Sequence, residues 1–424
     1  MKRKKQIFAL VMLFALLCVF VLASCQTEKA DYFNYTEANL GVMGKLVKLM
    51  HGWIGNYGWT VVVFTLFLKL VTLPLDIWQR VASRKMTQKN KQMQPLLAEI
   101  DKRYGANTPR ANEEKKKVYG KAGYSMFSSC LPMIISMVIF FVMFAGLRDY
   151  STYSSVKNFQ GLSDTYYEAY YTTVQQEGGE KWDYLQNEYN TVFESSQETN
   201  EYKKQTNAYI VGIDHFENKY GVAFCETYRN ASLEKVKEYY IGNHESWLWI
   251  QNVWQPDTWV SVMPAYNDST NGFSATVDMS EFGVDSGLTH YELIRSAVLQ
   301  TGIRGENGAW NGLMILPLLS IGLSFLSMFL SQYLDKKSKN KAEQPTEQDI
   351  QTATTNKTMM IMMPLLMAIF GFMYTGAFAI YMVVNYTLSI LSTVALRKPV
   401  EKIVDRSFAK EEAKNKSGKA SYMR

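Results

Sequence analysis

Cysteine and histidine are both scarce in this chain of 424 residues, which has four of each. Cys18 and Cys130 lie in apolar stretches and Cys25 follows a signal-like segment, so Cys225 stands alone in the hydrophilic part and no disulfide framework can form there. The histidines are scattered, and His244-Glu245 lacks the second histidine of a zinc-protease motif. A Walker A loop and an internal repeat are also absent. The sequence therefore contains no readable metal or nucleotide site.

Long apolar runs are abundant, although the mean hydropathy is slightly negative and the net charge is +6. This combination indicates a membrane part joined to a soluble part. Beyond the N-terminus, five runs are long enough to cross a bilayer, and the fourth is the shortest. They lie at residues 57–76, 125–147, 312–332, 358–374 and 376–396. Residues 40–55 instead predict an amphipathic helix on the outer membrane surface, and a short soluble helix fits this stretch equally well.

The N-terminus has the pattern of an export signal. Lys2 to Lys5 are basic, residues 7–22 are apolar, and Leu22-Ala-Ser-Cys25 follows. The last four residues resemble a bacterial lipobox, in which Cys25 is diacylated and becomes the mature N-terminus. An uncleaved signal anchor is the alternative. In both cases residue 26 onward begins outside the cytoplasm.

Charge predicts the orientation of the spans. Residues 77–124 carry 12 Lys/Arg against 4 acids, and residues 397–424 carry 9 against 4, whereas 148–309 carry 11 against 23. Because basic loops stay in the cytoplasm, the two basic segments and 333–357 are expected inside and 148–309 outside. This topology agrees with an exported N-terminus and an odd number of spans.

The segments between the spans differ in their expected structure. Residues 148–309 predict a soluble α+β domain, helical over 163–208 and 231–240 and strand-like over 257–266. Residues 82–122 predict a cytoplasmic helical hairpin with helices over 82–104 and 110–121. The basic tail 397–424 is expected to be disordered.

The predicted fold is an α-helical polytopic membrane protein. It has a core of five transmembrane helices with a cytoplasmic helical hairpin, and an inserted extracytoplasmic soluble domain of the α+β class. The expected domains are a signal peptide (1–24), a lipid anchor with the interfacial helix (25–56), two spans with the hairpin (57–147), the inserted domain (148–309), three spans (310–396) and the tail (397–424).

Lys69 is the most informative single residue, because it lies inside the first apolar run. A cation at membrane depth costs roughly 3 kcal/mol on insertion scales, so it normally faces water or a partner. At helical spacing Thr65, Lys69, Thr72 and Asp76 form one polar stripe. Three other spans carry similar stripes, formed by Ser125, Ser129 and Ser136, by Ser320, Ser324, Ser327 and Ser331, and by Tyr381, Asn385, Ser389 and Ser392.

If these stripes converge, they line a hydrated cavity with one positive charge. Two simpler interpretations remain open. Serines also allow close packing between membrane helices. Lys69 could extend its side chain to the cytoplasmic interface, roughly 10 Å away at helical rise.

Four stretches together resemble the YidC/Oxa family of membrane protein insertases, and most of all its Gram-positive, lipoprotein-type branch. They are Asn56-Tyr-Gly-Trp with Thr65-Leu-Phe-Leu-Lys-Leu-Val-Thr-Leu-Pro-Leu75, Met93-Gln-Pro-Leu-Leu-Ala-Glu-Ile-Asp-Lys-Arg-Tyr104, Ser129-Cys-Leu-Pro-Met-Ile-Ile-Ser-Met-Val-Ile-Phe140, and Met363-Pro364 with Thr375-Gly-Ala-Phe-Ala-Ile-Tyr381 and Asn385. The chain departs from the family pattern at three points: Lys69 stands where the family usually has Arg, Met382 replaces an aromatic residue, and the insertion 148–309 is unusually long.

The resemblance implies an ATP-independent insertase and chaperone, not an enzyme, that needs no cofactor and works through a hydrophilic groove open to the cytoplasm. The implied groove residues are Lys69, Thr65, Thr72, Asp76, Ser129, Ser136, Ser324, Ser327, Tyr381 and Asn385. The implied partners are nascent membrane proteins, the lipid bilayer, and a Sec translocon and ribosome near the tail and hairpin, without sequence-specific nucleic-acid binding. The implied location is the bacterial plasma membrane, with the lipid-anchored N-terminus outside and the C-terminus in the cytoplasm.

Three other classes of function stay open at this point. A small-molecule transporter or channel would need inverted repeats or broken spans, and none is visible. A membrane enzyme could pair Lys69 with a serine as a dyad, but Lys69 is expected in the cytoplasmic half of its span. Finally, segment 148–309 could be the working part, with the spans as its anchor.

Overall fold

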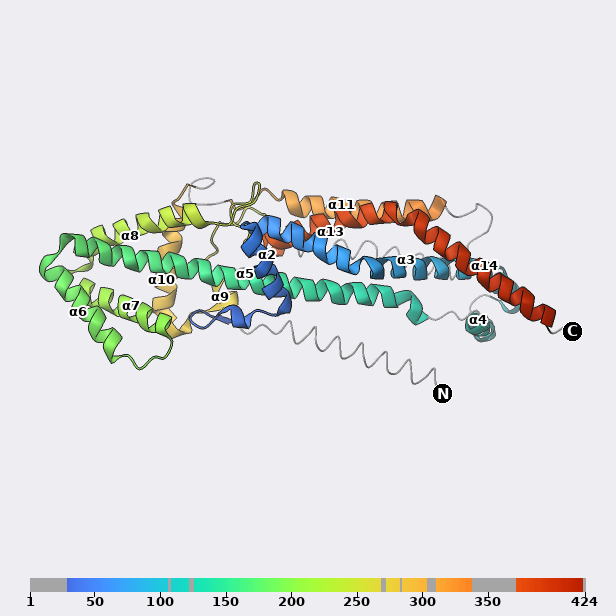
Figure 1. Cartoon of the computed structure of the whole chain (residues 1–424), viewed down its shortest axis with the longest axis horizontal. Helices are drawn as coiled ribbons and strands as arrows, with labels where there is room; N and C mark the ends of the chain where they lie inside the picture. Colours follow the sequence, from blue (N-terminus) through green and yellow to red (C-terminus); the bar gives the residue numbers. More distant parts are fainter. Residues whose placement is uncertain are drawn as a thin grey trace. The chain divides into compact units, whose positions relative to one another are not determined.

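The structure is a computed structural model (Figure 1), and it describes residues 29–105, 108–121, 126–267, 272–282, 284–302, 310–337 and 371–421. The predicted signal peptide, Cys25 and most of the predicted span 358–374 lie outside these residues. The chain divides into two compact units. Unit 1 comprises Met1–Val62, Phe141–Pro317 and Phe370–Ile380, and unit 2 comprises Val63–Phe140, Leu318–Ile369 and Tyr381–Arg424.

Helix α3 (Tyr57–Tyr104) runs without interruption from the first predicted span into the predicted hairpin. It ends where Gly105 takes a left-handed φ of 80°, a conformation that glycine adopts without steric cost. Helix α4 (Pro109–Lys121) then begins with proline at its first position, and the Thr108 hydroxyl accepts a hydrogen bond from the Ala111 amide at 3.2 Å. Both helices of the predicted hairpin are therefore present within the described residues.

A buried ion pair joins the two helices of the hairpin. Lys115 Nζ of α4 lies 2.6 Å from Asp101 Oδ1 of α3, and both side chains are largely buried. Met93, Leu97 and Ala111 are buried as well. The Lys115–Asp101 pair thus connects the two helices of the hairpin, and both helices also bury apolar side chains.

Unit 2 also contains most of α11 (Ile315–Lys337) and α13 (Gly376–Ala395), and all of α14 (Arg397–Ser421). Among the described helices, Tyr57–Lys85 and Gly376–Ala395 are long and apolar enough to cross a membrane by length and composition, and Ile315–Ser331 is a shorter apolar helix. The structure is predominantly helical, as predicted. A core of five spans stays a prediction.

Apolar and polar side chains are distributed inside out on α3 and α11. On α3 the exposed positions include Leu70 at 71% and Val71 at 61%, whereas Thr65 is 2% exposed. On α11 Ser320 and Ser324 are buried while Leu318 and Phe329 are exposed. In water such an arrangement would be costly, but in lipid it is the stable one, because apolar side chains face hydrocarbon and polar groups face the protein.

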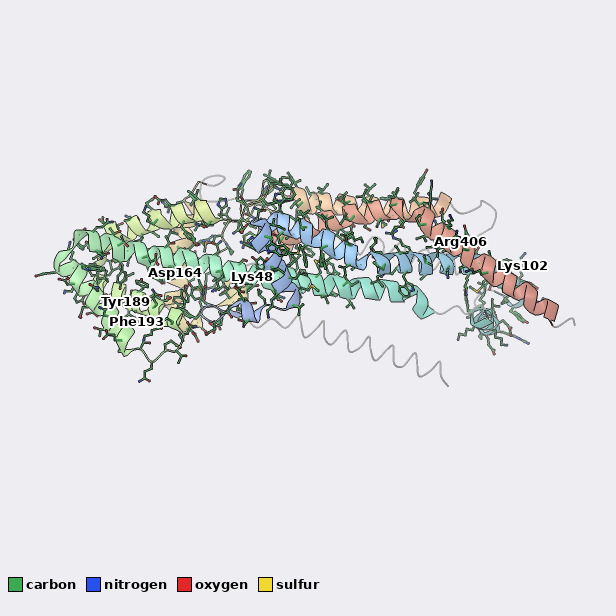
Figure 2. The ribbon with its side chains drawn as sticks, viewed as in Figure 1. Lys48, Lys102, Asp164, Tyr189, Phe193 and Arg406 are labelled. Atoms are coloured by element: carbon green, nitrogen blue, oxygen red, sulfur yellow. The ribbon has the colours of Figure 1, made fainter. Side chains whose placement is uncertain are left out.

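Unit 1 is built around an aromatic core. Helices α6 (Gly179–Ser195) and α7 (Glu201–Tyr220) pack against each other, and α8 (Val222–Asn243) contacts α7 and α10 (Val284–Leu299), as Figure 1 shows. Helix α5 (Met126–Glu177) supplies Tyr170, whose ring contacts Phe216 of α7 and Tyr228 of α8. Figure 2 shows Tyr189 and Phe193 on α6, and their rings stack 5.8 Å apart. Segments 163–208 and 231–240 are mostly helical, as predicted, with breaks at Gly178 and 196–200.

The first described residues of the chain belong to the same core. Strand β1 (Ala30–Asp31) pairs in parallel with β2 (Val277–Asp278), and the Tyr32 ring is fully buried. Gln160 of α5 donates a hydrogen bond to the Tyr32 carbonyl at 2.6 Å. Three short elements complete the unit, namely η1 (Glu37–Asn39), α9 (Phe273–Thr276) and η2 (Ser280–Phe282). Helix α2 (Val42–Ile54) forms where an amphipathic helix was predicted and ends at Gly55.

The α+β prediction for 148–309 is wrong in its β content. Among the described residues, the segment has six helices and contributes one two-residue strand, and 257–266 is irregular. This irregular backbone has a structural role. The buried Asp257 carboxylate accepts hydrogen bonds from the Leu313 and Leu316 amides, each at 2.8 Å, and so caps the start of α11.

The prediction of a disordered tail is also wrong, because residues 397–421 form α14. Val400 and Val404, four residues apart, are buried and anchor one face of the helix. Glu401 on this helix pairs with Arg84 of α3 at 2.7 Å. The apolar pair and the ion pair stabilise a helix that its high charge content alone would not indicate. The predicted boundary between residues 147 and 148 also lies inside α5.

Candidate functional site

An ion pair occupies the polar stripe of α3. Lys69 Nζ lies 2.6 Å from Asp76 Oδ2, and the two side chains are 20% and 19% exposed. Both residues were predicted in the site, but their pairing was not predicted. The charge pair is therefore neutral overall, and an incoming anion has to compete with Asp76 for Lys69.

The pair links two residues that are seven positions apart on one helix. At helical rise they are separated by roughly 10 Å along the axis. Helical side chains lean toward the N-terminus of their helix, so Lys69 has to extend in the opposite direction to reach Asp76. The ammonium therefore lies closer to the end of the predicted span than its Cα does.

The two threonines of the stripe have different surroundings. Thr72 donates a hydrogen bond to the Lys69 carbonyl at 3.4 Å. This bond satisfies the hydroxyl within its own helix, and Pro74, two residues further on, has no N–H to donate. Thr65 is buried one turn before Lys69. The α3 stripe is thus a buried or half-buried polar face.

The predicted residues on α11 and α13 are also buried or half-buried. Ser324 is buried, and it lies within hydrogen-bonding reach of Tyr386, the residue after Asn385. The Tyr381 ring is 8% exposed and its centroid lies 6.5 Å from that of Phe140. Ser327 and Asn385 are half-buried. A contact therefore joins Ser324 of the α11 stripe to α13, at a residue outside the predicted α13 stripe.

Ser129 and Ser136 lie within the backbone of α5, but their side chains fall outside the described residues. Convergence of all four stripes on Lys69 remains a prediction.

A second group of charged side chains, which sequence reasoning missed, lies on α3 and α14. Arg80 and Arg84 of α3 and Arg397 of α14 line one small cavity in unit 2. The spacing of Arg80 and Arg84, four residues apart, was a visible signal that both lie on one helix face. Arg397 could not have been added from spacing, because its approach depends on tertiary structure.

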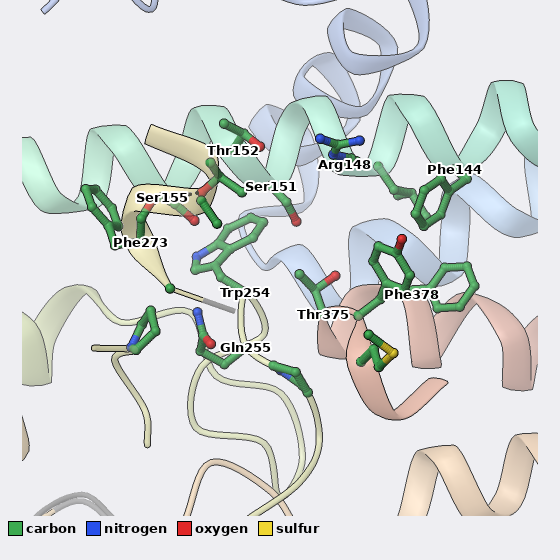
Figure 3. Close-up of a pocket in the computed structure, with 18 residues that line it drawn as sticks. Phe144, Arg148, Ser151, Thr152, Ser155, Trp254, Gln255, Phe273, Thr375 and Phe378 are labelled. Atoms are coloured by element: carbon green, nitrogen blue, oxygen red, sulfur yellow. Dashed lines mark hydrogen bonds between the residues drawn. The ribbon is translucent and has the colours of Figure 1, made fainter. Parts of the chain in front are cut away.

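Unit 1 contains a separate cavity of about 290 Å³, shown in Figure 3. Arg148, Ser151, Thr152 and Ser155 face it from α5, while Phe144 and Phe378 form an apolar end. Along α5 the side chains that line this cavity therefore change from apolar at Phe144 to hydroxyl-bearing at Ser151, Thr152 and Ser155. None of the predicted site residues lines this cavity.

The fold and the site together define a class, a helical membrane protein with polar groups on the buried faces of its apolar helices. Residues 49–176 match the family model described as "60Kd inner membrane protein". The relatives it resembles bear the name "Membrane protein insertase YidC". One, from Caldanaerobacter subterraneus subsp. tengcongensis, is 35% identical over 113 residues, which cover 27% of this chain and 53% of that protein. Another, from Chlorobium limicola, is 37% identical over 99 residues, which cover 23% and 16%.

These matches confirm the resemblance, and the match to the family model lies at residues 49–176. The chain spans about half the length of the first relative. The matched region contains Lys69, the hairpin and the start of α5. The names of the relatives describe an insertase and not an enzyme, in agreement with the prediction.

Proposed function

We propose that the chain inserts membrane proteins into the lipid bilayer and that Lys69 provides the charge that receives the polar flank of a client helix. The observation that carries this proposal is the inside-out pattern of α3, on which Lys69 and Asp76 share a half-buried polar face while Leu70 and Val71 are exposed. The family match at residues 49–176 supports it.

The chemistry of insertion on this proposal is exchange of a counterion. Lys69 holds Asp76 in the resting protein, and an acidic residue of the client flank replaces Asp76 at the ammonium. Attraction between opposite charges is stronger at a half-buried site than in water, because the effective dielectric constant is lower. The flank therefore avoids a full crossing of the hydrocarbon, and the apolar part of the client moves sideways into lipid, driven by hydrophobic burial.

The other parts of the proposal extend this scheme. The hairpin first receives the client on the cytoplasmic side, and no nucleotide hydrolysis is needed. The remaining groove residues, including Ser129, Ser136 and Asn385, line a hydrated space that receives the flank. Helix α14, with its basic residues, attracts a ribosome or anionic lipid. Cys25 anchors the N-terminus, segment 148–309 lies outside the cell, and a Sec translocon is a further partner.

The test is insertion of a small single-span client with an acidic exported flank into proteoliposomes that contain the full chain. Lys69→Ala and Lys69→Glu should lower insertion by on the order of tenfold or more, since a buried charge contact is worth upward of about 1.4 kcal/mol. Lys69→Arg should keep activity because the charge is retained.

Asp76→Asn removes the competing carboxylate and serves as the matched second variant. It should insert the acidic client at least as well as the wild type. A client with a neutral flank should be insensitive to both changes. Wild-type activity in Lys69→Ala would disprove the role of the charge, and no insertion by the wild-type protein would disprove the function itself.

A further inference from the structure

Three arginines gather around a cavity of about 130 Å³ in unit 2. Arg80 and Arg84 come from α3 and Arg397 from the first position of α14. The hydroxyl-bearing lining residues are Ser83, Ser331 and Thr393, and the remainder of the lining is aliphatic. The cavity is therefore small, basic and rich in hydrogen-bond donors.

The contacts of Arg80 show that its charge is not balanced by a salt bridge. Its guanidinium donates to Thr393 Oγ1 and to Ser392 Oγ, both at 3.0 Å and both on α13. Among the described residues no carboxylate lies within ion-pair distance of it. Asp76 is close enough to act on Arg80 electrostatically but is paired with Lys69. Two hydroxyls hold the guanidinium in place and leave its charge available.

Arg84 and Arg397 share a single counterion. Arg84 lies 2.7 Å from Glu401 Oε1, and Arg397 Nε lies 3.2 Å from the same oxygen. One carboxylate therefore serves two guanidinium groups of the cavity. Because a guanidinium has five N–H donors in a planar fork, each of these arginines retains donors for another oxyanion.

The cavity lies where three predicted spans end. Arg80 follows the first predicted span, Ser331 closes the predicted span of α11, and Arg397 follows that of α13. On the proposed topology all three ends are cytoplasmic, at the level of the lipid phosphates. Basic pockets between helices at this level favour the headgroups of anionic phospholipids. The same position makes a soluble acidic peptide a poorer fit.

We propose that this three-arginine cavity binds the phosphate of an anionic phospholipid from the cytoplasmic leaflet. The phosphate oxygens accept from Arg80, Arg84 and Arg397, and the Ser331 hydroxyl completes the contact. The lipid thereby joins α3, α11, α13 and α14 at their cytoplasmic ends. This inference uses the proposed topology but not the insertase activity, so the two can fail separately.

The test is native mass spectrometry of the full chain in detergent with added phosphatidylglycerol, phosphatidylcholine or glycerol 3-phosphate. The wild-type protein should retain phosphatidylglycerol in preference to phosphatidylcholine. Arg80→Gln, Arg84→Gln and Arg397→Gln should each weaken retention about fivefold, and the triple variant by on the order of 100-fold. The triple Lys variant, which keeps the charges, should retain most of the binding.

Arg406→Gln is the matched control, because it removes one arginine from the exposed surface of the same helix α14 (Figure 2). It should bind lipid as the wild type does. Equal retention of the two lipids, or wild-type retention by the folded triple Gln variant, would overturn the proposal. Binding of glycerol 3-phosphate as strong as that of the lipid would assign the site to a free phosphate, and preferential capture of an added acidic peptide would assign it to protein. If the triple Gln variant does not fold, the single variants decide by the same criteria.

Discussion

At the scale of single residues, the pairing of Lys69 with Asp76 changes how the site is understood. The sequence placed both residues on one stripe, but spacing alone cannot show that a lysine reaches seven residues toward the C-terminus. The pair explains how a lysine is tolerated in an apolar helix, since its charge has a partner at 2.6 Å. Lys69 is held by an internal counterion, which on the proposed function a client would displace.

A second residue with a specific consequence is His290, in the core of unit 1. Its ring stacks on Tyr167 at 5.0 Å between centroids, and its Nε2 lies 3.1 Å from Ser163 Oγ. Burial lowers the pKa of His290 from 6.5 to about 3. Between pH 3 and pH 6.5 the unfolded chain binds more protons at His290 than the folded chain does. The contribution of His290 to the stability of the folded state is therefore complete above pH 6.5 and is lost as the pH falls toward 3.

We predict that unit 1 loses between about 1 and 2 kcal/mol of stability from pH 7.5 to pH 5 through His290. Thermal unfolding of the full chain at the two pH values should show a smaller loss in His290→Gln than in the wild type. His215→Gln, an exposed histidine of α7, is the control. Burial raises the pKa of Asp164 to about 6. The contribution of this carboxyl group to stability therefore rises as the pH falls, and it is present in the wild type and in both histidine variants. An equal loss in His290→Gln and wild type would contradict the prediction.

At the scale of elements, sequence reasoning succeeded where local signals act and failed where distant contacts decide. Gly105 and Pro109 mark the end of α3 and the start of α4 through backbone preferences that are local. Residues 257–266 look strand-like by pattern, but Asp257 is held by amides more than 50 residues away. The buried valines of α14 lie among so many charged residues that composition hid their spacing of four.

The hairpin provides a test at this scale, because one ion pair connects its helices. Asp101→Ala leaves the largely buried Lys115 without its carboxylate and should destabilise the docking of α4 by about 2 kcal/mol. Hydrogen exchange of the α4 amides should become faster, while that of α13 should not change. Lys117→Ala, which removes an exposed ion pair with Glu114, should have little effect. Unchanged exchange in Asp101→Ala would show that apolar contacts alone hold α4.

At the scale of the whole molecule, the two units differ in the kind of side chain that they bury. Unit 1 buries aromatic rings such as Tyr170 and Phe216, as a protein in water does. Unit 2 exposes Leu70 and Phe329 and buries Ser320. This contrast was visible in the sequence as apolar runs beside an acidic, tyrosine-rich segment. The arginine cavity was not visible, because Arg397 is more than 300 residues from Arg84 and meets it only in the fold.

The most direct test of the central claim is site-specific photo-crosslinking from α3 to a ribosome-stalled client with an acidic flank. A photoreactive residue at position 72, on the stripe of Lys69, should crosslink to the flank, and one at position 71, which is exposed, should crosslink mainly to lipid. The crosslink from position 72 should fall sharply when the protein also carries Lys69→Ala. Equal crosslinking from positions 71 and 72, unaffected by Lys69→Ala, would contradict a polar, charge-guided path for the client.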